Sequence, residues 1–159
     1  MGRNGAKWDA MGELATEPFY AGTFCHRLDE KNRVTIPAKW RFKGDENDAY
    51  LAWPHPEGHI VLYPPTKVGQ LSAKISQIPE SNSAGQTILR RLFGAAHQLG
   101  PDSHGRLKLP EELLKAAHIS TDVVLIGLGD RINIQSRAAY DSETGQKINL
   151  LELMKEVGL

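Results

Sequence analysis

The chain has 159 residues, with 19 basic and 19 acidic side chains, a single cysteine and 40% hydrophobic residues. This composition is typical of compact soluble proteins and excludes disordered and fibrous chains. The lone Cys25 excludes an intramolecular disulfide framework, so we expect a reducing, cytoplasmic compartment. The apolar stretches are too short to span a membrane, and we expect no membrane partner. Because the net charge is zero, any site for a polyanion depends on uneven placement of the charges.

The N-terminal half of the chain is predicted to be mostly β. Residues 1–18 have no sustained apolar periodicity, and we expect a flexible extension there. Alternating residues over 24–28 predict a strand, followed by a polar turn over 29–32 and a short β-branched run over 34–36. A proline then opens a helix expected over 37–42, because its fixed φ suits a first helical turn.

The middle of the chain changes character. Apolar runs over 50–53 and 60–63 flank a Pro/Gly-rich turn, which predicts a β-hairpin. Apolar residues then fall at helical spacing over 68–78 and 88–96, so we expect two connecting helices. After the helices, the order of the first half returns. A polar turn over 102–106, a short run over 107–109 and a helix that runs from Glu111 to His118 follow, and then another hairpin.

An internal repeat with an offset of 73 residues is the most informative feature of the sequence. It superposes Asp29, Arg33, Ile36 and Pro37 on Asp102, Arg106, Leu109 and Pro110. Asn32 in one copy meets Gly105 in the other, and both residue types tolerate the left-handed backbone that we expect in the two turns. A copy of about 45 residues is too small to fold alone. We therefore predict one pseudo-symmetric domain in which the copies share a core or interleave their strands.

The segment GTFCHRLDEKNRVTIPAKWR, residues 22–41, together with the second Asp102 to Pro110 motif, resembles the MraZ family of bacterial transcriptional regulators of the division and cell-wall gene cluster. The resemblance covers about residues 19–140. It implies an α+β fold with two swapped-hairpin AbrB-like β-barrel repeats, and assembly into rings. Asn32 replaces the family's usual glycine.

The repeat and the resemblance together divide the chain into five parts. We expect a flexible N-terminal extension, a first AbrB-like repeat, connecting helices, a second AbrB-like repeat and a polar C-terminal tail, over residues 1–18, 19–65, 66–99, 100–140 and 141–159.

The two copies differ in local charge. The first carries an excess of four positive charges between Thr23 and Lys43, whereas the second is balanced between Asp102 and His118. Phosphate neutralisation supplies most sequence-independent affinity for DNA, so we predict that the first copy faces DNA and the second mainly supports structure. The predicted DNA-contacting residues are Arg33, whose guanidinium can pair bidentately with a base or phosphate, then Lys31 and Arg41, with Arg27 and Lys39 in the same patch.

A structural interpretation of the same residues remains open. Asp29 is the acceptor that would cap its turn through backbone N–H groups, and Arg33 would then pair with it inside the fold. For the second copy the scaffold role is preferred. The predicted turn scaffold comprises Asp29, Asn32, Asp102, Gly105 and Arg106.

Metal binding and catalysis find little support in the sequence. His55 and His59 have a spacing that would hold a metal on a helix, but Pro54 and Pro56 exclude a helix and no third ligand is evident. We therefore predict no metal, no cofactor and no small-molecule substrate. Cys25 is predicted to be a buried or half-buried thiol. The chain lacks a Gly-rich phosphate loop and a nucleophile elbow, so it is not predicted to be an enzyme.

The leading functional hypothesis is a nucleoid-associated, sequence-specific regulator, acting as a repressor. It would display its Asp29 to Arg33 loop around a ring and bind double-stranded DNA with direct repeats. Self-association is expected to cover a surplus of apolar residues, for which we propose Leu89, Leu92, Phe93 and Ile134. The alternative hypothesis is an AbrB-like protein-interaction or antitoxin module with secondary DNA binding.

Overall fold

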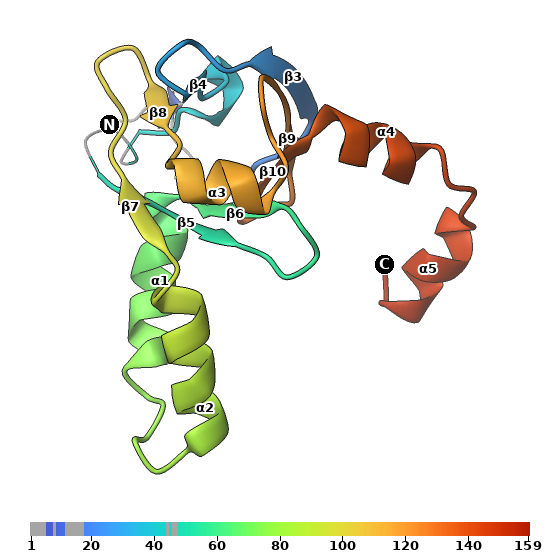
Figure 1. Cartoon of the computed structure of the whole chain (residues 1–159). Coiled ribbons are helices and arrows are strands. Elements are labelled where there is room, and N and C mark those ends of the chain that lie inside the picture. The colour runs from blue at the N-terminus through green and yellow to red at the C-terminus, as the bar shows by residue number, and fades with distance from the viewer. Residues whose placement is uncertain (1–5, 8, 12–17, 44, 46–47) are drawn as a thin grey trace.

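The computed structural model describes residues 6–7, 9–11, 18–43, 45 and 48–159 (Figure 1). Within this part of the chain, strands and helices alternate and all the larger strand pairings are antiparallel, which confirms the α+β class. The six-stranded sheet and the β4–β8 pair are both open. The swapped-hairpin barrel stays a prediction. No helix in the described residues is long and apolar enough to cross a membrane.

Two consecutive sets of elements repeat the same order of strand, strand, short helix, strand, strand and helix. The first set is β3 (Thr23–Arg27), β4 (Arg33–Thr35), the 3-10 helix η1 (Ala38–Trp40), β5 (Tyr50–Pro54), β6 (Ile60–Tyr63) and α1 (Pro65–Ile75). The second set is β7 (His97–Leu99), β8 (Arg106–Lys108), α3 (Glu111–Ala116), β9 (Asp122–Gly127), β10 (Ile132–Ser136) and α4 (Arg137–Thr144). The 73-residue repeat of the sequence is thus also a repeat of structure.

The remaining elements connect or flank these two sets. They are α2 (Ser83–Ile88), the π-helical turn η2 (Leu89–Phe93), α5 (Leu150–Glu156) and two short strands, β1 (Ala6–Lys7) and β2 (Asp9–Met11). Strands β1 and β2 pair in parallel within the stretch for which the sequence predicts a flexible extension. Most of that stretch lies outside the described residues, so the flexibility stays a prediction.

Local sequence signals explain where the helices begin. Pro65 lies in the first turn of α1, where its missing N–H costs no hydrogen bond. Asn82 caps α2 by accepting from the backbone N–H of Gly85, Ser136 caps α4 and Asn149 caps α5. Pro37 starts only the three-residue 3-10 helix η1, which is shorter than the helix predicted over 37–42.

The two structural repeats exchange strands across the main sheet. The strand order is β3-β9-β10-β6-β5-β7. Strands β3, β5 and β6 of the first repeat correspond to β7, β9 and β10 of the second, so the two halves of the sheet are related by a pseudo-twofold symmetry. At the edges, β3 of the first repeat pairs with β9 of the second, and β7 of the second pairs with β5 of the first. At the centre, β10 pairs with β6, with Ile134 opposite Ile60. Neither repeat therefore completes a sheet from its own strands.

Strands β4 and β8 form a separate antiparallel ribbon, one strand from each repeat. Val34 lies opposite Leu107, and both side chains are buried. Two further hydrogen bonds obey the same symmetry: the N–H of Ile36 donates to the carbonyl of Gly105, and the N–H of Leu109 donates to the carbonyl of Asn32, each at 2.9 Å. The ribbon thus connects the two turns that precede it.

The larger of two hydrophobic clusters in the described residues draws on both repeats. Trp40 and Leu113, which are equivalent in the repeat, are each 1% exposed in it. A smaller cluster of Trp53, Val61 and Tyr63 packs against apolar residues of α1 and η2. This second cluster anchors the helical arm of α1 and α2, which projects away from the β4–β8 ribbon in Figure 1.

Two expectations about burial are wrong. Cys25 is exposed, because β3 is an edge strand whose side chains alternate between exposed and partly buried, and Cys25 occupies an exposed position. Ile134 belongs to the core rather than to an apolar surplus. Leu89, Leu92 and Phe93 are partly buried, and their part in self-association stays a prediction.

The surplus of exposed apolar residues lies instead near the C-terminus, where the sequence suggested a polar tail. Position 141 falls inside α4, and α5 follows. The exposed large hydrophobic residues of this segment are Ile148, Leu150, Leu151, Leu153, Met154, Val157 and Leu159.

Candidate nucleic-acid interface

The turn that precedes β4 is organised by one aspartate. The Oδ1 atom of Asp29 accepts hydrogen bonds from the backbone N–H groups of Lys31 and Arg33, both at 2.9 Å. Its Oδ2 atom accepts from Arg33 Nε at 2.6 Å. Asn32 has a φ of 60°, in the left-handed region that its residue type tolerates. The side chain of Asp29 therefore fixes both the turn and the direction of Arg33.

The turn that precedes β8 has the same geometry. Asp102 Oδ1 accepts from the N–H groups of His104 and Arg106, both at 2.9 Å. Asp102 Oδ2 accepts from Arg106 Nε at 2.7 Å. Gly105 has a φ of 74°, as expected from its equivalence to Asn32. Both turns thus combine the capping and pairing roles that the structural interpretation assigned to their aspartates and arginines.

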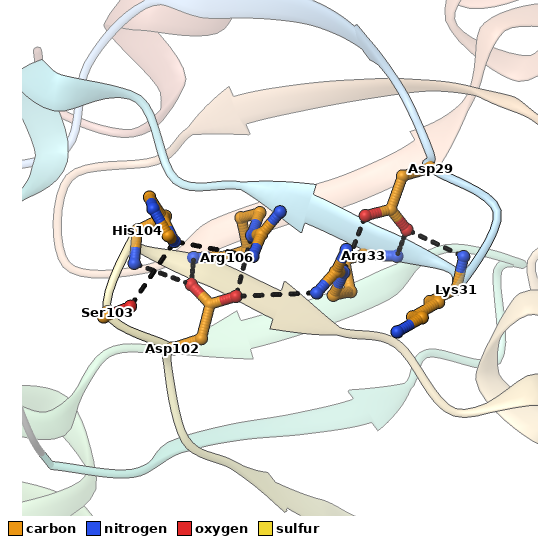
Figure 2. A network of polar contacts seen from close by, with 7 residues as sticks. All are labelled: Asp29, Lys31, Arg33, Asp102, Ser103, His104 and Arg106. Carbon is orange, nitrogen blue, oxygen red and sulfur yellow. Dashed lines mark hydrogen bonds and ion pairs between the residues drawn. The ribbon is translucent and has the colours of Figure 1, made fainter.

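The ribbon joins the two turns into one polar cluster, shown in Figure 2. In its register, Arg33 lies opposite Lys108 and Thr35 lies opposite Arg106. Arg33 Nη1 lies 3.9 Å from Asp102 Oδ2, so the first arginine reaches the aspartate of the other repeat. The two arginines consequently lie between the two aspartates along the ribbon.

Hydrogen bonding keeps both aspartates ionised. The backbone N–H of Arg33 is the largest cause of the lowered pKa of Asp29; burial, the next largest effect, opposes it, and the guanidinium and the N–H of Lys31 lower the pKa further. The equivalent donors from Arg106 and His104 lower the pKa of Asp102 to about 2. The guanidinium groups keep access to solvent, with 26% of the Arg33 side chain and 31% of the Arg106 side chain exposed. Each turn therefore holds an oriented, accessible guanidinium.

The other basic residues predicted to contact DNA lie at different places. Lys31 is exposed in the first turn, and Lys39 is exposed on η1. Arg27 ends β3 with its Nε atom 3.6 Å from Asp122 Oδ1. Arg41 donates from Nε to the carbonyl of Ile36 at 2.8 Å. Lys31 and Arg33 thus belong to the ribbon cluster, Arg41 lies beside Gly105 of the second turn, and Arg27 has its partner elsewhere.

The charge count along the sequence missed the contribution of the second repeat. Lys108 is exposed and lies opposite Arg33, and His104 is exposed in the second turn. The signal was present, because the repeat aligns Arg33 with Arg106. Only the pairing of β4 with β8 brings the two turns together in one ribbon cluster.

A second polar cluster occurs in the β5–β6 hairpin. His55 and His59 face each other with stacked rings whose centroids are 4.5 Å apart, and Glu57 lies between them in sequence. Burial is the largest cause of the lowered pKa of His59, and His55 lowers it further. The sequence identified the two histidines but not the glutamate.

The sequence of the chain is similar to that of one family of known proteins. Residues 92–153 match a family model described as "MraZ protein, putative antitoxin-like". A protein of Natranaerobius thermophilus named "Transcriptional regulator MraZ" is 34% identical over 137 residues, covering 86% of this chain and 94% of that protein. Proteins of the same name from Mesoplasma florum and Clostridium tetani are 31% and 29% identical, covering 86% and 88% of this chain and 93% and 99% of those proteins.

Proposed function

The chain belongs to the MraZ family, and we propose that it is a DNA-binding transcriptional regulator whose β4–β8 ribbon contacts double-stranded DNA. The relatives' shared name supports the regulatory role. The observation that carries the proposal is the placement of Arg33 opposite Lys108 on one ribbon, with Lys31 in the turn that precedes it. An antiparallel ribbon of two strands has the right width to enter the major groove.

The turn geometry favours base or phosphate recognition by Arg33. A guanidinium held at Nε by an aspartate keeps its terminal N–H groups in a fixed plane, which suits bidentate pairing with guanine or phosphate. Asp29 holds Arg33 in this way. Asp102 holds Arg106 with the same geometry, and there we propose a mainly structural role. Because side-chain freedom is already restricted in the free protein, less conformational entropy is lost on binding.

We propose that several copies of the chain bind together. One ribbon carries few uncompensated positive charges, so its affinity for DNA is small, and linked ribbons raise the overall affinity when operator sites recur in register. The exposed apolar residues of the 148–159 segment support association with a second copy, since so many exposed hydrophobic side chains are unusual on a monomer. A ring on direct repeats that represses its own operon is the arrangement we favour.

The test is binding to DNA from upstream of the protein's own operon, measured by fluorescence anisotropy over a series of salt concentrations. Affinity should fall steeply with salt because counterions are released from phosphates. Arg33→Ala should lose about 1 to 3 kcal/mol per engaged subunit. Lys74→Ala removes one exposed charge from α1, away from the ribbon, and should bind like the wild type.

Two outcomes would contradict the proposal. A log–log salt slope near zero would mean that the ribbon does not face phosphates. Equal affinities of the Arg33→Ala and Lys74→Ala proteins would remove the ribbon from the interface.

A second candidate function is protein interaction of the antitoxin type. The antitoxin-like description of the matched family model favours it, and so do the exposed apolar residues of α5. An assembled, folded protein that binds upstream DNA no better than unrelated DNA would favour this candidate. Light scattering measures the oligomeric state. A stable 17.6 kDa monomer would count against the proposed ring and against association through the 148–159 segment.

A further inference from the structure

The turn between β5 and β6 is a rigid three-residue loop. The N–H of His55 donates to the carbonyl of His59 at 2.8 Å, and the N–H of Gly58 donates to the carbonyl of His55 at 2.9 Å. Gly58 has a φ of 95°, which suits the left-handed position that closes such a loop. Pro56 fixes a further φ angle inside it. The two histidines therefore occupy facing positions that the backbone holds in place.

Three potential metal ligands converge at this turn. The rings of His55 and His59 stack at an interplanar angle of 11°, and one ligand atom each from His55, Glu57 and His59 lies within 4.8 Å of the other two. The two histidines are half-buried and Glu57 is exposed. The Trp53 ring, with its centroid 5.6 Å from that of His55, borders the pair on one side. The three groups thus lie close together at a solvent-accessible turn, and the stacked rings must rotate out of their parallel arrangement before both can ligate one ion.

We propose that His55, Glu57 and His59 bind a divalent transition-metal ion of the Zn²⁺ type. Two imidazoles and one carboxylate are a ligand set that Zn²⁺ accepts in tetrahedral sites, with the fourth position left to water. A hard cation such as Mg²⁺ prefers oxygen ligands and fits poorly. The proline argument against a metal site excluded only a helix, and the hairpin brings the same two side chains together by a different geometry.

The surroundings of the turn supply a further carboxylate. A cavity of about 560 Å³ is lined by Glu57 and His59 on the hairpin and by Glu143 on α4. Glu143 Oε1 accepts a hydrogen bond from Gln135 Nε2 at 3.2 Å. A negative charge beside the ligands favours a bound cation and can orient its water.

Metal binding must disturb one hydrogen bond of the free turn. The Nδ1 atom of His55 accepts from the N–H of Glu57 at 3.0 Å. Coordination through Nδ1 would displace this donor, and coordination through Nε2 would require the tautomer that carries its proton on Nδ1. In either case the Glu57 amide loses its acceptor. The amide resonance of Glu57 is thus a specific reporter of binding.

The experiment uses the full chain without an affinity tag, titrated with Co²⁺ and then with Zn²⁺ in competition. We expect one equivalent of Co²⁺ to give visible d–d absorption, Zn²⁺ to displace it, and the Glu57 amide resonance to shift. His59→Gln should weaken binding at least about tenfold. His118→Asn is the matched control, because His118 is exposed with a φ of 55° that asparagine tolerates, and it should bind like the wild type.

A second variant, Glu57→Gln, is needed if His59→Gln folds poorly. Glu57 is an exposed loop residue, so we expect its substitution to leave the fold intact. It should also weaken binding, by about tenfold, with an unchanged circular dichroism spectrum. The proposal is overturned if His59→Gln and Glu57→Gln bind Co²⁺ as tightly as the wild type. It is equally overturned if His118→Asn loses as much affinity as they do, since binding would then be spread over surface histidines.

Discussion

The turns of the two repeats share one backbone geometry, but their arginines have different neighbouring side chains. Each uses an aspartate that accepts two N–H groups and an arginine Nε, at distances that agree within about 0.1 Å. The neighbours of the two arginines differ, because Arg33 also reaches Asp102 across the ribbon, whereas Arg106 lies beside His104. The duplicated turns have thus kept the same hydrogen bonds although the side chains around them differ.

The comparison also changes how local charge should be counted. Along the sequence, the first repeat is basic and the second is balanced. In the fold, Lys108 and Arg106 of the second repeat share a ribbon with Arg33. The charges of both turns therefore contribute to one surface. The predicted division between a DNA-contacting repeat and a structural repeat has to be tested with matched variants.

The largest expected effects are in the shared core. Trp40→Ala should lower the free energy of unfolding by about 3 to 5 kcal/mol and Leu113→Ala by about 2 to 5 kcal/mol, because both side chains are buried at equivalent positions. Denaturant unfolding followed by tryptophan fluorescence and circular dichroism measures both. Each variant should unfold in a single transition, because the exchanged strands couple the repeats. Separate transitions would show two independent units.

The next comparison concerns DNA binding by Arg106→Ala beside Arg33→Ala. Arg33→Ala should lose most binding while its oligomer size stays unchanged. We expect Arg106→Ala mainly to lower the melting temperature and to leave binding by the folded fraction closer to normal. Anisotropy and size-exclusion chromatography on both proteins make the measurement. Equal loss of binding in two folded, assembled variants would mean that both turns touch DNA.

A smaller effect is expected at the left-handed positions. Gly105→Ala should lower the free energy of unfolding by about 1 to 2 kcal/mol, because its φ of 74° is unfavourable for alanine. A Cβ there would also lie 2.8 Å from Arg41 Cζ, so the guanidinium must move. Asn32→Gly should change the free energy by less than about 1 kcal/mol. Thermal unfolding measures both variants. A Gly105→Ala protein as stable as the wild type would contradict the backbone strain expected for alanine at this φ.

The smallest expected effect is on the stability of the fold at acid pH. Asp102 has a pKa of about 2 in the folded chain against 3.8 ordinarily, so its ionised form stabilises the fold above about pH 4. This contribution is lost as the pH falls from about 4 towards 2. The lowered pKa of Asp29 gives the same sign. Asp102→Asn should reduce the dependence of the melting temperature on pH in this range, and an unchanged slope would show that the carboxylate is not linked to folding.

The sequence by itself determined the repeat, the α+β class and the turn chemistry. Identical Asp, Arg and Pro residues at an offset of 73 required two equivalent turns. Residues that tolerate a positive φ marked Asn32 and Gly105, and alternation of apolar residues marked the strands. These features depend on interactions between residues close in the chain, so local rules are sufficient to predict them.

Only the tertiary structure decided which strands pair and which side chains meet. The exchange of β3 and β7 between repeats, the facing of Arg33 and Lys108, and the exposure of Cys25 on an edge strand all depend on partners about 45 to 100 residues away. Glu57 meets His55 and His59 because a hairpin turn, not a helix, sets their spacing. Long-range pairing is selected by burial of the whole core, which no local pattern contains.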